Sequence, residues 1–327
     1  MATIKDIAKK AGVSISTVSY ALNGTGAVSD ATKKKILEVA KELNYNPNAI
    51  ARRLKKKKQE LIAVIVRDFH GPIYGEIIRG IRDVAQENDY EMVVAASYNN
   101  NKLTKILTEW VVDGAIILDS LISDETILDL ANKDFHIVTL DRVIDKEHVS
   151  NVLIDNERAA RRVVEYFVEL GYSEIGFIGG PKESLDNIRR CEGFKEGMNN
   201  ANLSIENDWF VFSDFTERGG YQSMIEQINN GKLPRAYFVA NDEMAIGAMK
   251  ALQNANIRIP EDVAIIGFDD IQLADYMSPK LTTVRRPSYE LGSLAGEILI
   301  KSLKKGQTVK NKLLETELII RESCHKR

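Results

Sequence analysis

Polar and charged residues follow several short apolar segments in the long C-terminal part of the chain. They are Asp141-Arg142, Asp214-Phe215, Asn241-Asp242 and Asp269-Asp270, and Arg190 lies in a helical pattern between the first two. Carboxylates accept hydrogen bonds and guanidinium groups donate them in pairs, so these residue types can hold a small polar ligand. Each Asp or Asn alone fits equally well as a cap of the helix that follows. Four such positions together with an arginine predict a ligand-binding constellation.

No catalytic or metal-binding set accompanies these residues. The four histidines are scattered without metal-ligand spacing: His70, His136, His148 and His325. The sequence has no GxSxG elbow, no P-loop and no GxGxxG after a strand. The sequence therefore gives little support to an enzymatic function, and we expect no catalytic residue, no metal and no cofactor.

A second group of residues that can bind a partner lies near the N-terminus. The hydroxyls of Ser16, Ser19 and Tyr20 can meet base edges or phosphates, and Ile15 offers an apolar contact to a thymine methyl group. This chemistry requires a helix that presents these side chains outward.

The sequence around them predicts such a helix after a first one. Thr3 and Asp6 resemble a capping box, although Asp replaces the preferred Glu or Gln. Apolar residues then recur at helical spacing from Ile4 to Ala11, which indicates one buried face. Gly12 ends this helix and permits a tight turn.

Two further helices complete the expected domain. Ser14 is placed to cap the second helix, and Ser29 caps a third that extends to Leu43. The inward positions of the second helix are Val18, Ala21 and Leu22. Two short helices joined by Ala11-Gly12-Val13 form a helix-turn-helix, whose second helix enters the major groove of DNA.

The charge distribution supports a DNA-binding segment. Residues 1–58 contain thirteen basic and four acidic residues, a net charge of +9, whereas the remainder carries −12. Such asymmetry indicates a basic module that meets a polyanion, joined to an acidic body that does not. A solvated basic tail is the plainer interpretation, but the helical pattern within the segment argues against it.

The body of the chain alternates short apolar segments with longer helical patterns. The predicted strands are Leu61–Val66, Met92–Ala96, Ala115–Leu118, Ile137–Leu140, Ile175–Ile178, Phe210–Phe212, Ala236–Val239 and Val263–Ile266. This rhythm is typical of doubly wound parallel sheets. The fold class is α/β, with an N-terminal all-α helix-turn-helix domain and two Rossmann-like lobes of periplasmic-binding-protein type.

Several motifs give the chain a specific resemblance. Near the N-terminus they are Thr3-Ile4-Lys5-Asp6-Ile7-Ala8, Ala11-Gly12-Val13-Ser14, Thr17-Val18-Ser19 and Leu43-Asn44-Tyr45-Asn46-Pro47-Asn48. Farther along they are Arg190-Cys191-Glu192-Gly193-Phe194, Asn241-Asp242-Glu243-Met244-Ala245 and Gly267-Phe268-Asp269-Asp270. Over essentially its whole length the chain resembles the lactose-repressor (LacI–GalR) family of transcriptional regulators.

The resemblance implies which residues contact DNA. They are Thr3, Ser14, Ile15, Ser16, Thr17, Ser19, Tyr20, Asn23, Ala51, Leu54 and Lys55. Ile15, Ser16 and Tyr20 occupy the family's specificity positions, but Tyr20 is not the Arg found there in some members. Leu54 occupies the position of the hinge-helix leucine that wedges between base pairs from the minor groove. Two hinges side by side sustain such a wedge, so the resemblance implies a homodimer on a pseudo-palindromic, double-stranded operator.

The resemblance also implies an effector site between the lobes. Its residues are Tyr74, Asp141, Arg142, Arg190, Phe215, Asn241 and Asp269. Carboxylates and arginines pair with vicinal hydroxyls while an aromatic face covers a sugar ring, so we expect a pentose or hexose effector. The family alternatives are a carbon-catabolite regulator, whose corepressor is a phosphorylated phosphocarrier protein, and a nucleobase-responsive repressor. A transport-linked binding protein and an enzyme are the alternatives outside the family.

The expected domains follow from these assignments. Residues 1–46 form the helix-turn-helix domain and residues 47–59 the hinge helix or linker. Residues 60–327 form an effector-binding and dimerisation core, with a first lobe of about 60–156 and 287–313 and a second of about 157–284 and 316–327. The sequence has no apolar signal region or membrane-length apolar run, and Cys191 and Cys324 are far apart. We therefore expect a cytoplasmic protein without a membrane partner.

Overall fold

A computed structural model describes residues 2–23, 26–43, 45, 59–67, 69, 71–96, 102, 104, 105, 107, 112–118, 122–306, 308, 309 and 311–326. The chain divides into two compact units, Met1–Gln59 and Glu60–Arg327. Of the predicted DNA contacts, Ala51, Leu54 and Lys55 lie outside the described residues, and so does the side chain of Asn23.

The first unit contains three helices around a small core. They are α1 (Ile4–Ala11), α2 (Ile15–Asn23) and α3 (Asp30–Glu42). Ile7, Val18 and Ile36, one from each helix, are completely buried against one another. The predicted helix-turn-helix with a third supporting helix is therefore confirmed.

The helix ends form as the sequence predicts. Thr3 and Asp6 make both hydrogen bonds of a capping box at the start of α1. Gly12 ends α1 with φ +68°, a left-handed conformation that glycine adopts without strain. Ser14 Oγ accepts a hydrogen bond of 3.1 Å from the backbone N–H of Thr17 and so caps α2.

The first lobe of the second unit is a six-stranded sheet between two layers of helices. Its strand order is β11-β5-β4-β3-β1-β2, and all its pairings are parallel. The strands are β1 (Leu61–Val66), β2 (Glu91–Ala96), β3 (Gly114–Leu118), β4 (His136–Thr139), β5 (Val149–Ile154) and β11 (Lys312–Leu314). Helices α5 (Pro72–Glu87) and α12 (Ser288–Lys305) cover one face, and α7 (Asp124–Ala131) covers the other.

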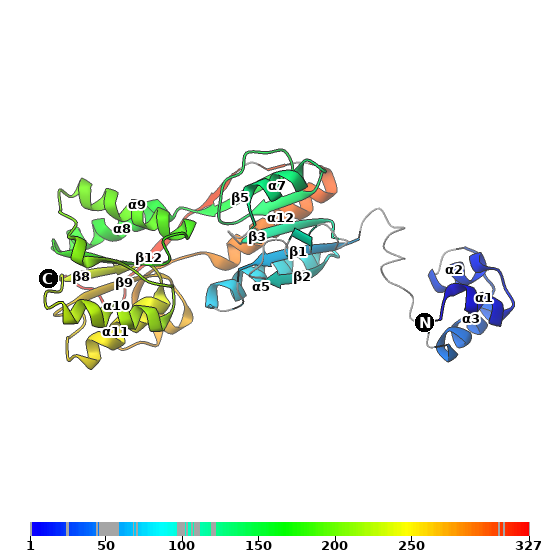
Figure 1. Ribbon diagram of the computed structural model, residues 1–327, viewed down its shortest axis with the longest axis horizontal. Helices are drawn as coiled ribbons and strands as arrows, with labels where there is room; N and C mark the ends of the chain where they lie inside the picture. The colour runs from blue at the N-terminus through cyan, green and yellow to red at the C-terminus, as the bar shows by residue number, and fades with distance from the viewer. Residues whose placement is uncertain are drawn as a thin grey trace. The chain divides into compact units, whose positions relative to one another are not determined.

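The second lobe repeats this plan. Its strand order is β12-β10-β9-β8-β6-β7, with β12 antiparallel to β10 and the other pairings parallel. The strands are β6 (Ile175–Gly179), β7 (Phe210–Phe212), β8 (Ala236–Val239), β9 (Ala264–Asp269), β10 (Thr282–Arg285) and β12 (Glu317–Ile319). Its helices are α8 (Asn156–Glu169), α9 (Leu185–Asn200), α10 (Glu217–Asn229) and α11 (Asp242–Asn254), with short turns η1 (Asn207–Trp209) and η2 (Gln272–Asp275). Figure 1 shows α8 and α9 on one side of β8 and β9, and α10 and α11 on the other.

The chain passes repeatedly between the two lobes. It crosses after β5, returns after β10 to form α12 and β11, and crosses again to form β12. Both lobes are therefore built from segments that are far apart in sequence (Figure 1).

All eight predicted strands are present, with ends that differ by at most a few residues. The sequence also predicts a strand at Glu317–Ile320, which corresponds to β12, whereas β5, β10 and β11 were not predicted. In β5 the polar residues Ser150 and Asn151 are buried and interrupt the apolar run. Asn151 is tolerated there because its amide bonds Thr139 Oγ1, the backbone of Ile144 and Asn311 Oδ1. The last predicted strand begins later, at Ala264, and continues to Asp269.

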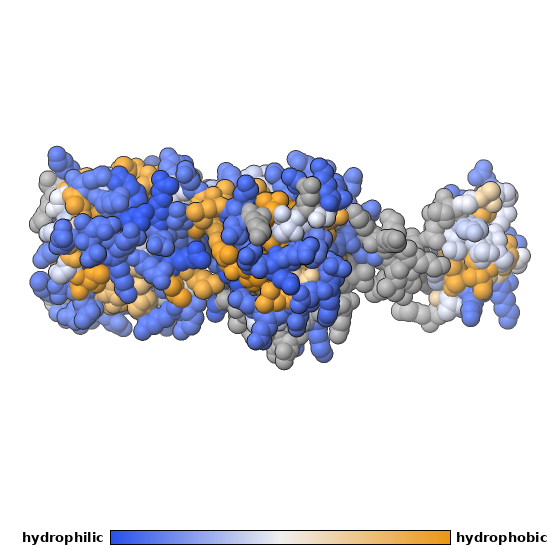
Figure 2. Space-filling model, turned by 90° about the horizontal axis from the view of Figure 1, so that it is seen from above, coloured by the Kyte–Doolittle hydropathy of each residue, from blue (hydrophilic) through white to orange (hydrophobic). Residues whose placement is uncertain are grey.

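The visible surface of the second unit is mainly hydrophilic, with apolar residues gathered in patches (Figure 2). Among the described helices, none has the length and apolar character needed to span a membrane. The described His, Cys, Asp and Glu side chains form no group suited to a metal ion.

Candidate functional site

The outward face of α2 carries the predicted base-reading side chains. Ile15 and Tyr20 are 47% and 48% exposed, and Ser16 is exposed between them. At the helix cap the Ser14 hydroxyl bonds the hydroxyl of Ser16 at 2.7 Å and that of Thr17 at 2.8 Å. This arrangement leaves an apolar group, a small hydroxyl and a phenol on one exposed helix face.

In the second unit, the predicted polar residues lie at the carboxyl ends of the strands. Asp141 follows β4, Asn241 follows β8 and Asp269 ends β9. Ligands of open α/β sheets bind at these strand ends. Phe215 follows β7, Arg190 lies in α9, and Tyr74 comes from α5 of the first lobe.

Asp141 and Arg142 form a bidentate ion pair with distances of 3.0 and 2.7 Å. Arg142 also donates to the carbonyl of Ile122 and to Asp124. The guanidinium therefore fixes the Asp141 carboxylate in place. Burial raises the pKa of Asp141 above its ordinary value, and Arg142 opposes this shift.

Arg190 is the centre of a buried charged cluster. It is 2% exposed, and its guanidinium lies 3.6 Å from the centre of the Phe268 ring. It donates to Asn156 Oδ1 at 2.8 Å and to the carbonyl of Ala240. Two carboxylates, those of Asp186 and Asp269, lie 3.8 Å from its Nη2 atom. Burial lowers the pKa of Arg190, and the two carboxylates oppose this effect.

Arg286 and Asp186 complete the cluster, and the sequence analysis did not identify them as site residues. Arg286 Nη1 donates to Asp186 Oδ2 at 2.9 Å, and both side chains are largely buried. Burial raises the pKa of Asp186, but Arg286 and Arg190 outweigh it and the net shift is downward. Arg286 directly follows β10, so recognition of that strand would have placed it with the other strand-end residues.

Two atoms of this cluster have no hydrogen-bond partner among the described residues. They are Asp269 Oδ1, an acceptor, and Arg286 Nε, a donor, and both are buried. The two residues are close, because the Arg286 backbone N–H donates to the Asp269 carbonyl at 3.3 Å. Buried polar atoms are normally paired, so the unpaired donor and acceptor indicate a place for a ligand.

Asn241 serves as a cap and also holds the neighbouring loop. Its Oδ1 accepts from the Met244 backbone at 3.0 Å, which caps α11, and its Nδ2 donates to the Phe215 carbonyl at 2.9 Å. Phe215 has φ +67°, an uncommon conformation for a bulky residue. Each amide atom of Asn241 thus makes one hydrogen bond within the protein, and that of Nδ2 positions Phe215.

Asp242 lies next to Asn241 and is completely buried. Its oxygens accept from Thr283 Oγ1 at 2.6 Å and from the Ile271 backbone at 2.9 Å. Burial, reinforced by the nearby charge of Asp269, raises the pKa of Asp242 well above its ordinary value of 3.8.

This shift predicts a pH dependence of stability. Folded Asp242 keeps its proton at pH values where an unfolded Asp has lost it, so folding takes up a proton between the two pKa values. The stabilisation is present near pH 4 and is lost as pH rises through the raised pKa. On acidification from pH 7 to 5, we expect the free energy of unfolding of the wild type to rise relative to that of Asp242→Asn, by up to about 1.4 kcal/mol per pH unit. Urea unfolding at several pH values measures this; parallel curves for the two proteins would contradict it.

Comparisons with known proteins match both the helix-turn-helix part and the ligand-site part of the chain to known families. Residues 3–48 match the family model described as bacterial regulatory proteins, lacI family, and residues 164–324 match a periplasmic binding protein-like domain. The HTH-type transcriptional regulator RegA of Clostridium saccharobutylicum is 36% identical over 99% of both chains.

The chain belongs to the LacI family.

This membership confirms the resemblance seen in the sequence and makes the chain a DNA-binding transcriptional repressor. The LacI-family chain is also 31% identical to the catabolite control protein A of Priestia megaterium, with 96% of both chains covered. Among solved structures, a lac repressor dimer bound to operator and the anti-inducer ONPF matches with a TM-score of 0.80, 27% identity and 98% of both chains covered. A ribose-bound LacI family regulator from Enterococcus faecium matches with a TM-score of 0.74 and 28% identity, covering 82% of this chain and 99% of that one.

Proposed function

We propose that this LacI-family repressor responds to a neutral, hydroxyl-rich effector, a pentose or hexose, bound between its lobes. The proposed site comprises Tyr74, Asp141, Arg142, Arg190, Phe215, Asn241 and Asp269, to which the structure adds Asp186 and Arg286. Arg142 and Asn241 act mainly by positioning Asp141 and Phe215, whose contacts with them are direct.

The atoms Asp269 Oδ1 and Arg286 Nε, which have no hydrogen-bond partner among the described residues, carry this proposal. An alcohol hydroxyl is both donor and acceptor, so the hydroxyls of one ligand can satisfy both atoms. A carboxylate on the ligand would be repelled by Asp269, and an amine would be repelled by Arg286 and Arg190. The two buried arginines and the carboxylates of Asp186 and Asp269 balance in charge, which favours a neutral ligand.

The proposed DNA contacts are those implied by the sequence: Thr3, Ser14, Ile15, Ser16, Thr17, Ser19, Tyr20, Asn23, Ala51, Leu54 and Lys55. The protein acts as a homodimer on a pseudo-palindromic operator. It has no catalytic role, and its place of action is the cytoplasm, where operator DNA lies. The exposed side chains of α2 support its role as the base-reading helix.

Effector binding and DNA binding are linked by a population shift. A ligand that contacts both lobes favours the lobe arrangement to which it binds more tightly, and DNA affinity changes by the coupling free energy. Such coupling is typically about 1–3 kcal/mol, and operator DNA changes effector affinity by the same factor.

Operator binding tests the proposal. Fluorescence anisotropy of the full chain on a palindromic site selected from random DNA is measured while pentoses, hexoses and nucleobases are titrated. We expect one sugar to change operator affinity about tenfold or more, which corresponds to about 1.4 kcal/mol. A response to a nucleobase and to no sugar would overturn the sugar assignment.

A protein corepressor is the second candidate, because the catabolite control protein A of Priestia megaterium is a relative over nearly the whole chain. In that case, the partner is a phosphorylated phosphocarrier protein. A pull-down with that carrier in both phosphorylation states distinguishes the two candidates. Capture of the phosphorylated form alone, without any sugar effect on operator affinity, would favour the corepressor.

The exposed phenol of Tyr20 provides a test of the DNA contacts. Tyr20→Ala removes one hydrogen-bonding group from the base-reading face, so we expect operator affinity to fall about fivefold, or about 1 kcal/mol. The preference for the selected operator over variants with single base changes should also relax. Leu37→Ala on α3, equally exposed but off this face, is the matched control and should change neither quantity. Equal losses for the two variants would contradict the assignment.

A further inference from the structure

A pocket of about 520 Å³ lies beside α8, where the chain passes between the two lobes, and we call it the hinge pocket. Helix α8 of the second lobe lines it with Arg158, Arg161 and Arg162. Residues of the segment 313–318, which joins β11 of the first lobe to β12 of the second, also line it. The volume is within the range of sites that bury small molecules.

All three crossings between the lobes reach the hinge pocket. Asp155 joins β5 to α8, and Glu315 and Thr316 join β11 to β12. Val284 lies one residue before the end of β10, where the third crossing begins. A change of lobe arrangement alters the backbone angles of such connecting residues. A ligand in contact with all three crossings therefore favours the lobe arrangement in which it fits best.

On the side of α8, the hinge pocket is next to the buried charged cluster of the effector site. Asp155 caps α8 and directly precedes Asn156, which is the first residue of the helix. Asn156 accepts a hydrogen bond of 2.8 Å from Arg190 Nε and donates one of 2.9 Å to Asp186. A ligand that moves Asp155 therefore also moves a hydrogen-bond partner of both cluster residues.

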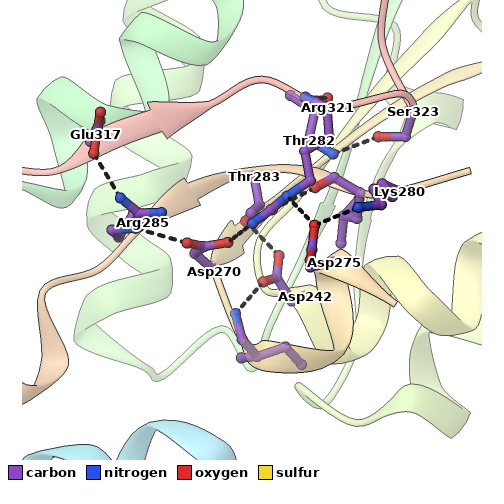
Figure 3. Close-up of polar contacts among 12 residues, drawn as sticks. Asp242, Asp270, Asp275, Lys280, Thr282, Thr283, Arg285, Glu317, Arg321 and Ser323 are labelled. Carbon is purple, nitrogen blue, oxygen red and sulfur yellow. Dashed lines mark hydrogen bonds and ion pairs between the residues drawn. The ribbon is translucent and has the colours of Figure 1, made fainter. Parts of the chain in front are cut away.

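A second connection runs through the network in Figure 3. Glu317, which lines the hinge pocket, accepts a hydrogen bond of 3.0 Å from Arg285. Arg285 also donates to Asp270 at 2.8 Å. Asp270 follows Asp269 and Arg285 precedes Arg286, so each partner in this contact is next to a residue of the cluster. The hinge pocket and the effector site thus share two physical connections.

One pair of opposite charges in the hinge pocket is held only loosely. Arg158 Nη1 lies 3.5 Å from Glu315 Oε1, and the two side chains are 66% and 87% exposed. So exposed an ion pair contributes little to stability, and a ligand displaces it at small cost. Arg161 and Arg162 instead donate to carboxylates outside the pocket, at 2.7 and 2.5 Å. Arg158 and Glu315 are therefore the charged groups best placed to bind a ligand.

The lining chemistry suits a zwitterion with an apolar body. A ligand carboxylate pairs with Arg158 and a ligand ammonium with Glu315, which replaces one loose ion pair with two. Leu313, which is 57% exposed, and Leu318 offer apolar contacts between them. The lining holds four carboxylates and three arginines, so a phosphate or dicarboxylate is disfavoured. Among the described residues that line the pocket none is aromatic, so a ring to cover a sugar face is missing.

We propose that the hinge pocket binds a second effector, a zwitterion with an apolar body such as an apolar α-amino acid or a dipeptide of such residues. Through the three crossings, this ligand biases the lobe arrangement and thereby operator affinity. The inference goes beyond the proposed function and does not depend on a sugar in the cleft.

Calorimetric titration of the full chain tests the site. The probes are leucine, phenylalanine and leucyl-leucine, with leucinamide and N-acetylleucine as analogues that lack the carboxylate or the ammonium group. We expect at least one of the three zwitterions to bind, and each analogue to bind about tenfold more weakly than leucine or leucyl-leucine. Absence of binding by all three zwitterions, or equal affinity for the two analogues and their parent, would overturn the proposal.

Variants place the ligand in the pocket. Arg158→Gln and Glu315→Gln should each lower zwitterion affinity about tenfold, because each removes one of the two ion pairs. Arg258→Gln is the matched control, since Arg258 is 69% exposed and ion-paired on the same lobe. It should change zwitterion affinity less than about twofold. Equal losses in the Arg158 and Arg258 variants would contradict binding in the hinge pocket.

Operator binding tests the regulatory part. With the zwitterion at saturation, operator affinity measured by fluorescence anisotropy should change about fivefold or more in the wild type and stay unchanged in Arg158→Gln. Bound zwitterion without any effect on operator affinity would overturn the coupling. A sugar response with no zwitterion binding would overturn only the hinge pocket, whereas zwitterion binding with no sugar response would overturn only the sugar effector.

Discussion

Arg190→Met is expected to destabilise the second unit by about 3–5 kcal/mol and to abolish effector binding. The substitution keeps most of the side-chain volume but leaves the buried carboxylate of Asp269 without its nearest guanidinium. It also leaves the Ala240 carbonyl and Asn156 Oδ1 without the donor that they have now. Unfolding in urea, followed on the full chain, measures the first effect, and calorimetric titration below the unfolding transition measures the second.

Two controls make this result specific to Arg190. Arg189→Met changes the adjacent residue of the same type, which forms no ion pair with any described residue, and should alter stability by less than about 0.5 kcal/mol. Arg190→Lys keeps the positive charge but loses the paired donors, so it should recover part of the stability while effector affinity stays low. An Arg190→Met protein within about 1 kcal/mol of the wild type would show that the cluster does not depend on this guanidinium.

Gly247→Ala is expected to destabilise the second lobe by about 3 kcal/mol, at the upper end for overpacking. A Cβ atom at Gly247 in α11 would lie 1.9 Å from the Glu217 carbonyl oxygen and 2.7 Å from the Tyr221 nitrogen in α10. Both are backbone atoms, so relief requires the two helices to move apart. Because α11 begins at Asp242, this movement also disturbs the Asn241 cap and, through it, the loop that carries Phe215. Thermal unfolding should show a midpoint lowered by roughly 6–12 °C.

Gly75→Ala is the matched control. Gly75 also lies within a helix, α5, but a Cβ atom there meets no heavy atom of the described residues within 4 Å, apart from its chain neighbours and its own helix. Alanine favours a helix over glycine by about 0.5–1 kcal/mol, so this variant should be neutral or slightly stabilised. Equal destabilisation by the two variants would contradict the close helix contact.

The sequence was most informative where burial follows a simple pattern. Leu61–Val66 was recognisable as β1 because a strand covered on both faces is apolar throughout. The caps at Thr3, Ser14 and Ser29 were recognisable because a short polar side chain just before a helical pattern accepts a hydrogen bond from the backbone N–H of the first turn.

The missed parts depend on contacts between distant segments. Thr282 and Thr283 are polar, yet both are completely buried in β10. Thr283 can be buried because its hydroxyl donates to Asp242, forty-one positions away in sequence. Because β10 was not predicted, nothing in the sequence placed Arg286 at the end of a strand. Its contact with Asp186 was therefore not predictable.

The interleaved path of the chain between the lobes determines the order in which they can be completed during synthesis. The first lobe begins at β1, yet its helix α12 and its edge strand β11 lie at residues 288–314, after the strands β6 to β10 of the second lobe. At about 5–20 residues per second, the apolar face of α5 that packs on α12 waits roughly 10–40 s on the ribosome for its partner. The second lobe, although it begins later, can bury most of its core first. The nascent first lobe is therefore the part of this repressor most exposed to proteases and chaperones before release.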